Sequence, residues 1–157
     1  VLELLFAEGE QDLSSGQDEN TTENKERVIL GNERFDEYLP LLEGKKVALF
    51  TNQTGIIGNL EDGEHILDAL IEKNVDVTAV FCPEHGFRGN EDAGSDIEDS
   101  VDEKTGVPLL SLYASEDTHM PSEEDMGLFD TLVIDMQDVG LRYYTYYISM
   151  YYLMDGY

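Results

Sequence analysis

Blocks of apolar residues alternate with amphipathic and polar segments along the chain, and their lengths predict strands separated by helices and loops. Residues 47–50 and 75–82 are rich in apolar side chains, which is typical of strands covered on both faces. Between them, residues 64–74 repeat apolar side chains at the spacing of an amphipathic helix. This strand–helix–strand unit predicts a right-handed parallel crossover.

The second half of the chain continues the same alternation. Two shorter strands are expected at 109–113 and 131–136, with an acidic loop over 114–125 between them that has room for a helical turn. A helix is expected at 143–154, despite its high tyrosine content. The complete pattern predicts an α/β fold: a Rossmann-like, doubly wound, mostly parallel sheet with flanking helices.

The first part of the chain differs in composition from the rest. Residues 8–26 hold almost no large apolar side chains and many acidic ones, so residues 1–27 are expected to form a flexible acidic leader or linker. The short apolar patch before residue 8 is either the end of a secretion signal or a frayed helical turn. Residues 28–157 are expected to form one domain, which begins with loosely helical spacing interrupted by Gly31 and Pro40.

The charge balance narrows the classes of partner. Nine Lys and Arg residues stand against thirty-five Asp and Glu residues, for a formal net charge of −26. Nucleic acids and anionic membrane surfaces bind clustered cations, so neither is expected as a partner. The sequence contains no run of eighteen apolar residues, so no membrane-spanning helix is predicted. The single cysteine, Cys82, excludes an internal disulfide framework. The acidity is compatible with a saline habitat, which remains a hypothesis.

Three polar segments follow three of the predicted strands. They cover residues 51–55, 83–89 (with Asp92 close behind) and 137–146. Ligands of parallel sheets bind beyond the carboxyl ends of the strands, so these segments are expected to converge on one edge of the sheet. For the first segment, ordinary turn formation by Asn52, Thr54 and Gly55 is an equally complete explanation.

The segment after residue 82 carries the strongest candidate chemistry. Glu84 and His85 lie on a turn after a strand that ends in proline, where a carboxyl group can donate a proton beside an imidazole. Arg88 and Arg142 are two of only nine cations, and a guanidinium group suits a carboxylate ligand. Each arginine has the alternative of pairing with one of the many acidic side chains.

Neither a metal nor a cofactor is expected. Glu84, His85, Asp92 and His119 could form a metal site, but their spacing fits no zinc pattern. Cys82 ends a buried strand, where a cysteine usually behaves as a small apolar side chain, so a Cys–His nucleophile is rejected.

The motifs TNQTG, PEHGFRG followed by DAG, TGVPLLSLY and DMQDVGLRYYTY occur in an order and spacing that resemble the exo-β-N-acetylmuramidase family of the NamZ type. The resemblance runs from about residue 41 to residue 150. It implies a two-domain protein that releases N-acetylmuramic acid from the non-reducing ends of peptidoglycan fragments. It therefore also implies a secreted, periplasmic or envelope-associated location.

The resemblance implies roles for the residues in these motifs. Glu84 would be the catalytic acid, aided by His85, and Asp138 is the candidate second carboxylate. The separation of two such carboxylates distinguishes inversion from retention, and substrate-assisted catalysis stays open. The residues that would bind the muropeptide or N-acetylmuramyl saccharide are Asn52, Gln53, Thr54, Arg88, Asp92, Gln137, Arg142 and Tyr144.

Two departures from the family qualify these expectations. Tyr147 interrupts the usual pattern after YTY, and the chain stops well short of a full member. The tyrosine-rich end is expected to expose an apolar patch that the C-terminal domain of the family covers, and the fragment is expected to be weakly active or inactive. The alternatives are a non-catalytic module that binds muropeptides or a partner, and a metal-dependent hydrolase.

Overall fold

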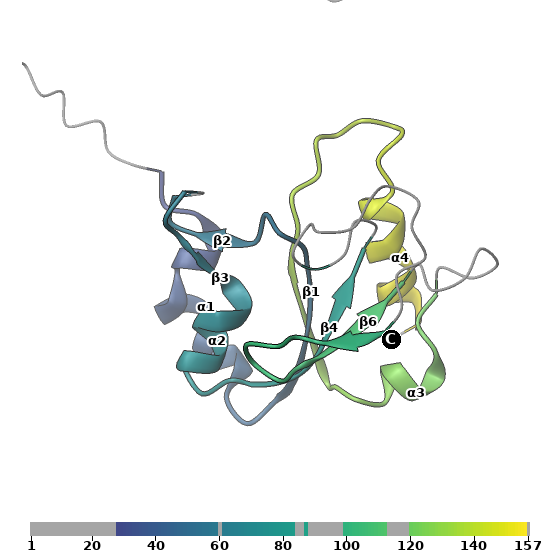
Figure 1. Cartoon of the computed structure of the whole chain (residues 1–157), viewed down its shortest axis with the longest axis horizontal. Coiled ribbons are helices and arrows are strands. Elements are labelled where there is room, and N and C mark those ends of the chain that lie inside the picture. Colours follow the sequence, from purple (N-terminus) through teal and green to yellow (C-terminus); the bar gives the residue numbers. More distant parts are fainter. Residues whose placement is uncertain (1–27, 60, 84–86, 88–98, 113–119, 157) are drawn as a thin grey trace, which may run out of the picture.

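The computed structural model describes residues 28–59, 61–83, 87, 99–112 and 120–156 of the 157-residue chain. Its principal sheet has five strands in the order β5-β6-β4-β1-β7, and helices lie on both of its sides (Figure 1). The strands are β1 (Lys46–Thr51), β4 (Asp76–Cys82), β5 (Ser100–Val101), β6 (Pro108–Ser111) and β7 (Thr131–Asp135). All neighbours pair in parallel except β5 and β6, so the predicted α/β fold with a mostly parallel sheet is confirmed.

The helices are η1 (Gly31–Glu33), α1 (Phe35–Leu42), α2 (Ile66–Glu72), α3 (Glu123–Met126) and α4 (Tyr146–Gly156). The helices α1, α2 and α4 form within the segments expected to be helical, with shifted ends, α3 forms at the end of the acidic loop that had room for a helical turn, and η1 was not predicted. A two-stranded antiparallel ribbon, β2 (Ile56–Ile57) and β3 (Glu64–His65), precedes α2 and was not predicted. The antiparallel strand β5 was not predicted either.

Both faces of the sheet are covered, which explains why β1 is a continuous apolar run. Side chains alternate between the two faces of a strand. Val47 and Leu49 pack into a core with α1 and α2, whereas Ala48 and Phe50 pack into a second core with Leu153 of α4. All four of these β1 side chains are completely buried.

The outer face of α4 is exposed, as the tyrosine-rich sequence predicts. Tyr146, Ser149 and Leu153 are buried against the sheet. Tyr147 and Tyr151 are 47% and 56% exposed, and Met154 is 60% exposed.

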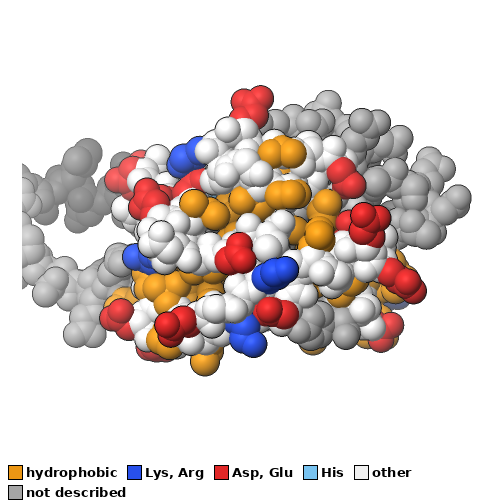
Figure 2. All heavy atoms as spheres, turned by 90° about the horizontal axis from the view of Figure 1, so that it is seen from below, with side chains coloured by type: hydrophobic (Ala, Val, Ile, Leu, Met, Phe, Trp, Pro, Cys, Tyr) orange, Lys and Arg blue, Asp and Glu red, His pale blue; other side chains and the backbone are white. Residues whose placement is uncertain are grey.

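The face of the molecule seen in Figure 2 carries many charged side chains. Acidic side chains lie around this face, with Lys and Arg side chains between them and hydrophobic side chains grouped toward the middle. No helix in the described part of the chain is long and apolar enough to cross a membrane.

Candidate functional site

The carboxyl ends of β4, β1 and β7 lie side by side at one edge of the sheet. Phe50 of β1 pairs with Phe81 of β4, and Thr51 of β1 pairs with Asp135 of β7. The chain proceeds from β1 outward through β4 to β6 and then returns to β7 on the other side of β1. Ligands of open α/β sheets bind at such a reversal of strand order. The three polar segments therefore begin at one edge, as the sequence predicts.

The loop after β1 is a tightly bonded turn. Asn52 is 1% exposed, and its Oδ1 accepts hydrogen bonds from the backbone N–H (2.9 Å) and the hydroxyl (2.7 Å) of Thr54. This arrangement is the ordinary turn chemistry of asparagine and threonine. Gln53 is exposed between them, so its amide is the most accessible group of this loop.

The loop after β7 holds the other described candidates. Gln137, Asp138, Arg142 and Tyr144 are all exposed. Asp138 Oδ1 accepts a hydrogen bond of 2.6 Å from the N–H of Gly140, whose positive φ of 69° suits glycine. The Tyr144 ring packs edge-on against Tyr146, with 5.9 Å between centroids.

Thr54 and Gln137 both line a groove of about 580 Å³ that runs along β7. One end of the groove is polar, because Asn32, Asp135 and Gln137 line it, and the remainder is mostly apolar. Another cavity, of about 600 Å³, lies at the opposite edge of the sheet, where Lys45 and Asp76 flank the amino ends of β1 and β4. Because ligands of parallel sheets bind at the carboxyl ends, the groove along β7 is the better candidate.

Glu84, His85, Arg88 and Asp92 lie outside the described residues, so their proposed roles stay predictions. Within the same segment, Phe87 is described and is 3% exposed. Its ring meets the ring of His65 edge-on, with 4.6 Å between centroids and 73° between planes. Through His65, Phe87 therefore lies beside the loop that begins at Asn52.

His65 is a residue that the sequence reasoning did not select. It is buried, its Nδ1 accepts the N–H of Leu67 (3.2 Å), and its Nε2 lies 2.9 Å from the carbonyl oxygen of Asn52. Because a carbonyl only accepts and a backbone N–H only donates, these bonds assign a neutral ring with its proton on Nε2. The sequence feature that could have drawn attention to His65 is a polar residue directly before an amphipathic helix, which is typical of a helix cap.

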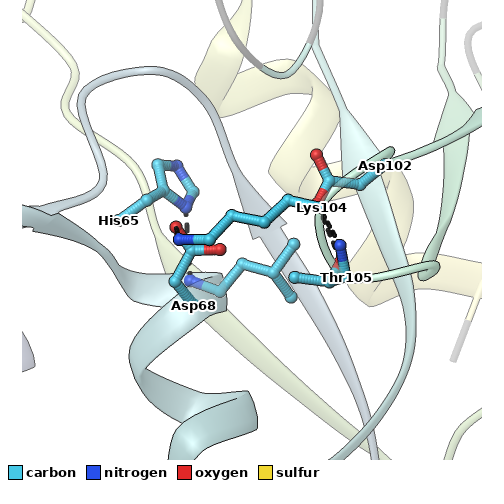
Figure 3. A network of polar contacts seen from close by, with 6 residues as sticks. His65, Asp68, Asp102, Lys104 and Thr105 are labelled. Atoms are coloured by element: carbon cyan, nitrogen blue, oxygen red, sulfur yellow. Dashed lines mark hydrogen bonds and ion pairs between the residues drawn. The ribbon is translucent and has the colours of Figure 1, made fainter.

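Asp68 and Lys104 were not selected either. The carboxylate of Asp68 is buried on the first turn of α2, and Nζ of Lys104 lies 2.7 Å from its Oδ2 (Figure 3). Together with Gln53, Glu64 and His65, they line a polar cavity of about 460 Å³. A charged residue inside the apolar stripe of a helix was the signal that could have identified Asp68.

Within the described part of the chain, no three His, Cys, Asp or Glu side chains are grouped so that they could hold a metal ion. All four residues weighed as metal ligands, Glu84, His85, Asp92 and His119, lie outside that part. Burial raises the pKa of the Cys82 thiol to about 12, with further contributions from Asp99 and Asp102. The core position expected for Cys82 is therefore confirmed: it is 2% exposed.

A family model, a curated protein and solved structures all relate this chain to one family. The family described as "Exo-beta-N-acetylmuramidase NamZ, N-terminal" matches residues 47–157. The peptidoglycan beta-N-acetylmuramidase NamZ of Bacillus subtilis (strain 168) is 39% identical over 145 residues, which cover 91% of this chain and 34% of that protein.

Two crystal structures of DUF1343 family proteins from Bacteroides fragilis NCTC 9343 share the fold, each with a TM-score of 0.65. One is 50% identical, and the match covers 81% of this chain and 30% of that one. The other is 38% identical, with 78% and 29% covered. This chain therefore spans 34% of the length of the curated relative, and a similar share of the solved structures.

Proposed function

Because the chain belongs to the family of the NamZ N-terminal domain, we propose that it is the N-terminal part of a peptidoglycan exo-glycosidase. The reaction is the release of N-acetylmuramic acid from the non-reducing ends of cell-wall fragments. The observation that carries the proposal is the family match over residues 47–157, which includes the three polar segments that follow β1, β4 and β7 in the sequence.

We propose Glu84 as the general acid and base, aided by His85. Support comes from the sequence neighbours of Glu84: Pro83 is buried at the end of β4, and Phe87 is packed on His65 beside the Asn52 loop. A carboxylic acid near a sheet edge and next to a saccharide site can protonate the glycosidic oxygen as the bond breaks.

Asp138 is the proposed second carboxylate. It is exposed at the same edge of the sheet, on the loop after β7. Two carboxylates on opposite sides of a glycosidic bond are the usual arrangement in glycosidases. Saccharide contacts are proposed for Gln53, Thr54, Gln137 and Tyr144. Asn52 is proposed to contact the saccharide through the hydrogen-bonding groups that its turn does not use. Arg142 or Arg88 would pair with the lactyl carboxylate, and Asp92 lies close by in sequence.

The decisive experiment is the Glu84→Gln variant of the full gene product, assayed on a chromogenic glycoside of N-acetylmuramic acid. General acid catalysis contributes about 10²- to 10⁴-fold, so turnover should fall by at least about 10²-fold while saccharide affinity is kept. Glu123→Gln is the matched control, because Glu123 is exposed on α3. Unchanged turnover in Glu84→Gln would refute the assignment. Saccharide binding by the parent protein without any turnover would identify a non-catalytic muropeptide-binding module.

The exposed face of α4 is the proposed contact surface for the rest of a longer protein. Tyr147, Tyr151 and Met154 are each about half exposed, and the relatives extend well beyond the matched region. We therefore expect the 157 residues alone to show little activity. Hydroxyl-radical footprinting of a longer chain should show reduced labelling of Tyr147 and Tyr151, and unchanged labelling would contradict this contact.

The proposed substrate also implies a location, because peptidoglycan lies outside the cytoplasmic membrane. We propose that the protein acts as a secreted, periplasmic or envelope-associated enzyme. Fractionation of cells with an antibody against the chain tests this, and recovery in the cytoplasm alone would contradict it.

A further inference from the structure

β7 lies at the end of the strand order, so β1 is the one strand that pairs with it in the described part of the chain. Natural edge strands are protected by lysine, proline, a bulge or very short length. β7 reads TLVID, and all five of its residues pair with β1 in unbroken register. At the opposite edge of the sheet, β5 is only two residues long. The composition of β7 is therefore that of an interior strand.

An apolar groove follows the free edge of β7. The groove of about 580 Å³ described above is lined by every residue of β7, from Thr131 to Asp135. Leu30 and Leu41 also line it, and they are 40% and 72% exposed. Ile134 is 39% exposed on the strand itself. The edge thus offers an added strand both backbone hydrogen-bonding groups and an apolar surface to cover.

The helices lie on two faces of the sheet. α2, which connects β1 to β4, packs in the core that contains Val47 and Leu49. Met126 of α3 and Leu153 of α4 belong to the other core, with Phe50. Figure 1 shows α1 and α2 on one side of the sheet and α3 and α4 on the other.

This arrangement determines where a strand after α4 would lie. Right-handed crossovers on opposite faces of a sheet move in opposite directions across it. The connection from β1 through α2 moves toward β6, and the connection from β6 through α3 returns past β1 to β7 on the other face. α4 shares the face of α3 and follows β7. A right-handed crossover through α4 therefore leads away from β1, onto the free edge of β7.

Resting on the proposed function, which makes these residues the N-terminal part of a longer enzyme, we propose that the polypeptide after α4 adds a sixth strand parallel to β7. The relatives have the length for it, since the match covers 34% of the Bacillus subtilis protein and 30% of one solved structure. The strand covers Ile134 and the apolar part of the groove. The polar end, with Asn32 and Gln137, stays open at the carboxyl edge of the sheet.

Hydrogen exchange in the full gene product tests whether the edge is occupied. Alternate N–H groups of a strand point to its two sides, so those of β7 that point away from β1 exchange rapidly on a free edge. With a sixth strand in place, every N–H from Leu132 to Asp135 should exchange at least about 10²-fold more slowly than in an unfolded peptide. Rapid exchange of alternate N–H groups would overturn the proposal.

Photo-crosslinking identifies the occupant. Ile134→Met keeps a similar side-chain volume, and photo-methionine then places a small diazirine at position 134. Crosslinks that the parent protein lacks should join position 134 to the roughly 30 residues that follow α4, because a short loop and one strand fit within that length. Crosslinks to a distant segment would overturn the proposal. Crosslinks between copies, detected by mixing ¹⁵N-labelled and unlabelled protein, would also overturn it.

A charge placed at the edge gives an energetic test. Lysine is harmless on a free edge but loses its water beneath an added strand. Ile134→Lys should raise the unfolding equilibrium constant of the full gene product by at least about tenfold. Val101→Lys is the matched control, because Val101 is 57% exposed on β5 at the opposite edge. An effect of Ile134→Lys no larger than that of Val101→Lys would overturn the proposal.

Turnover plays no part in these measurements, so the two proposals can fail separately. An inactive protein whose position 134 crosslinks to the residues after α4 would keep the sixth strand and lose the proposed reaction. An active enzyme in which alternate N–H groups of β7 exchange rapidly would keep the reaction and lose the strand.

Discussion

Asn32 donates a hydrogen bond from Nδ2 to Oδ2 of Asp135 at 3.1 Å, across 103 positions of sequence. The same amide donates to the carbonyl of Ile56 at 3.2 Å, and the hydroxyl of Tyr38 donates to the carbonyl of Asn32 at 2.9 Å. These contacts attach η1 to the carboxyl end of β7. They form the polar end of the groove that Thr54 and Gln137 line.

The burial of Tyr38 and its closeness to Asp135 control its ionisation. Burial raises the pKa of Tyr38 to about 12, and the negative charge of Asp135 adds to the effect. Asp135→Asn should therefore lower the pKa of Tyr38 while leaving it above 10, because the burial remains. The measurement is a spectrophotometric titration of tyrosinate, with the Tyr38→Phe curve subtracted. A pKa that stays at about 12 in Asp135→Asn would show that the charge has no influence.

Position 55 requires glycine because neighbouring atoms leave no room for a Cβ. A Cβ there would overlap the hydroxyl of Thr51 and would lie 3.2 Å from Cγ2 of Ile66 and 3.3 Å from Oδ2 of Asp135. Gly55→Ala should therefore lower the free energy of unfolding by about 1–3 kcal/mol, the usual cost of overpacking. Urea denaturation measures this change.

Gly31→Ala is the control for Gly55→Ala. No atom lies within 4 Å of a Cβ at Gly31, and its backbone does not adopt a positive φ. Its unfolding free energy should stay within about 0.5 kcal/mol of the parent. Equal effects in the two variants would mean that the close approach at Gly55 is relieved without cost.

The centre of the sheet was predictable because β1 and β4 are buried on both faces. Burial of this kind requires continuous apolar runs, which mark β1 and β4 in the sequence directly. The strands β2, β3 and β5 have two residues each, too few for any periodicity to appear. The sequence also predicts an interruption at Pro40, yet α1 continues through it. Tyr38, Leu39 and Leu42 pack on the core, and this burial outweighs the hydrogen bond that proline cannot donate.

The site was predictable only in part. Three loops at one edge follow from parallel strands, and this reasoning located Gln53 and Gln137 at the same edge. The pairing of Asn32 with Asp135 depends on the order of the strands, which places β7 beside β1. A single sequence contains no signal for such a contact. His65 was missed because a polar residue at the start of a helix predicts only a cap.

Cys82 should be unreactive in the folded protein. Its pKa of about 12 lies well above the ordinary 9.0, so almost no thiolate is present at pH 8. We expect a thiol reagent such as dithionitrobenzoate to react only after urea unfolds the chain. Rapid stoichiometric labelling under native conditions would contradict the buried position.

The same group makes folding sensitive to alkaline pH. Above pH 9 the unfolded chain releases the Cys82 proton while the folded chain keeps it, until the pH approaches 12. The unfolded state then binds fewer protons, so the free energy of unfolding decreases as the pH rises through this range. Cys82→Ala should show a shallower decrease between pH 9 and 12. An identical slope in the two proteins would assign the alkaline loss of stability to other groups, Tyr38 among them.

The net charge of −26 predicts that salt stabilises the fold. Repulsion among exposed carboxylates opposes the compact state, and the screening length falls from about 10 Å at 0.1 M salt to about 3 Å at 1 M. Sodium chloride should therefore raise the free energy of unfolding over this range. The double variant Glu61→Gln/Asp62→Asn removes two exposed negative charges and should reduce the salt dependence. Sucrose, which is also excluded from protein surfaces but does not screen charge, should stabilise both proteins equally. If unfolding is insensitive to salt, the repulsion is too weak to matter and the hypothesis of adaptation to a saline habitat loses its physical basis.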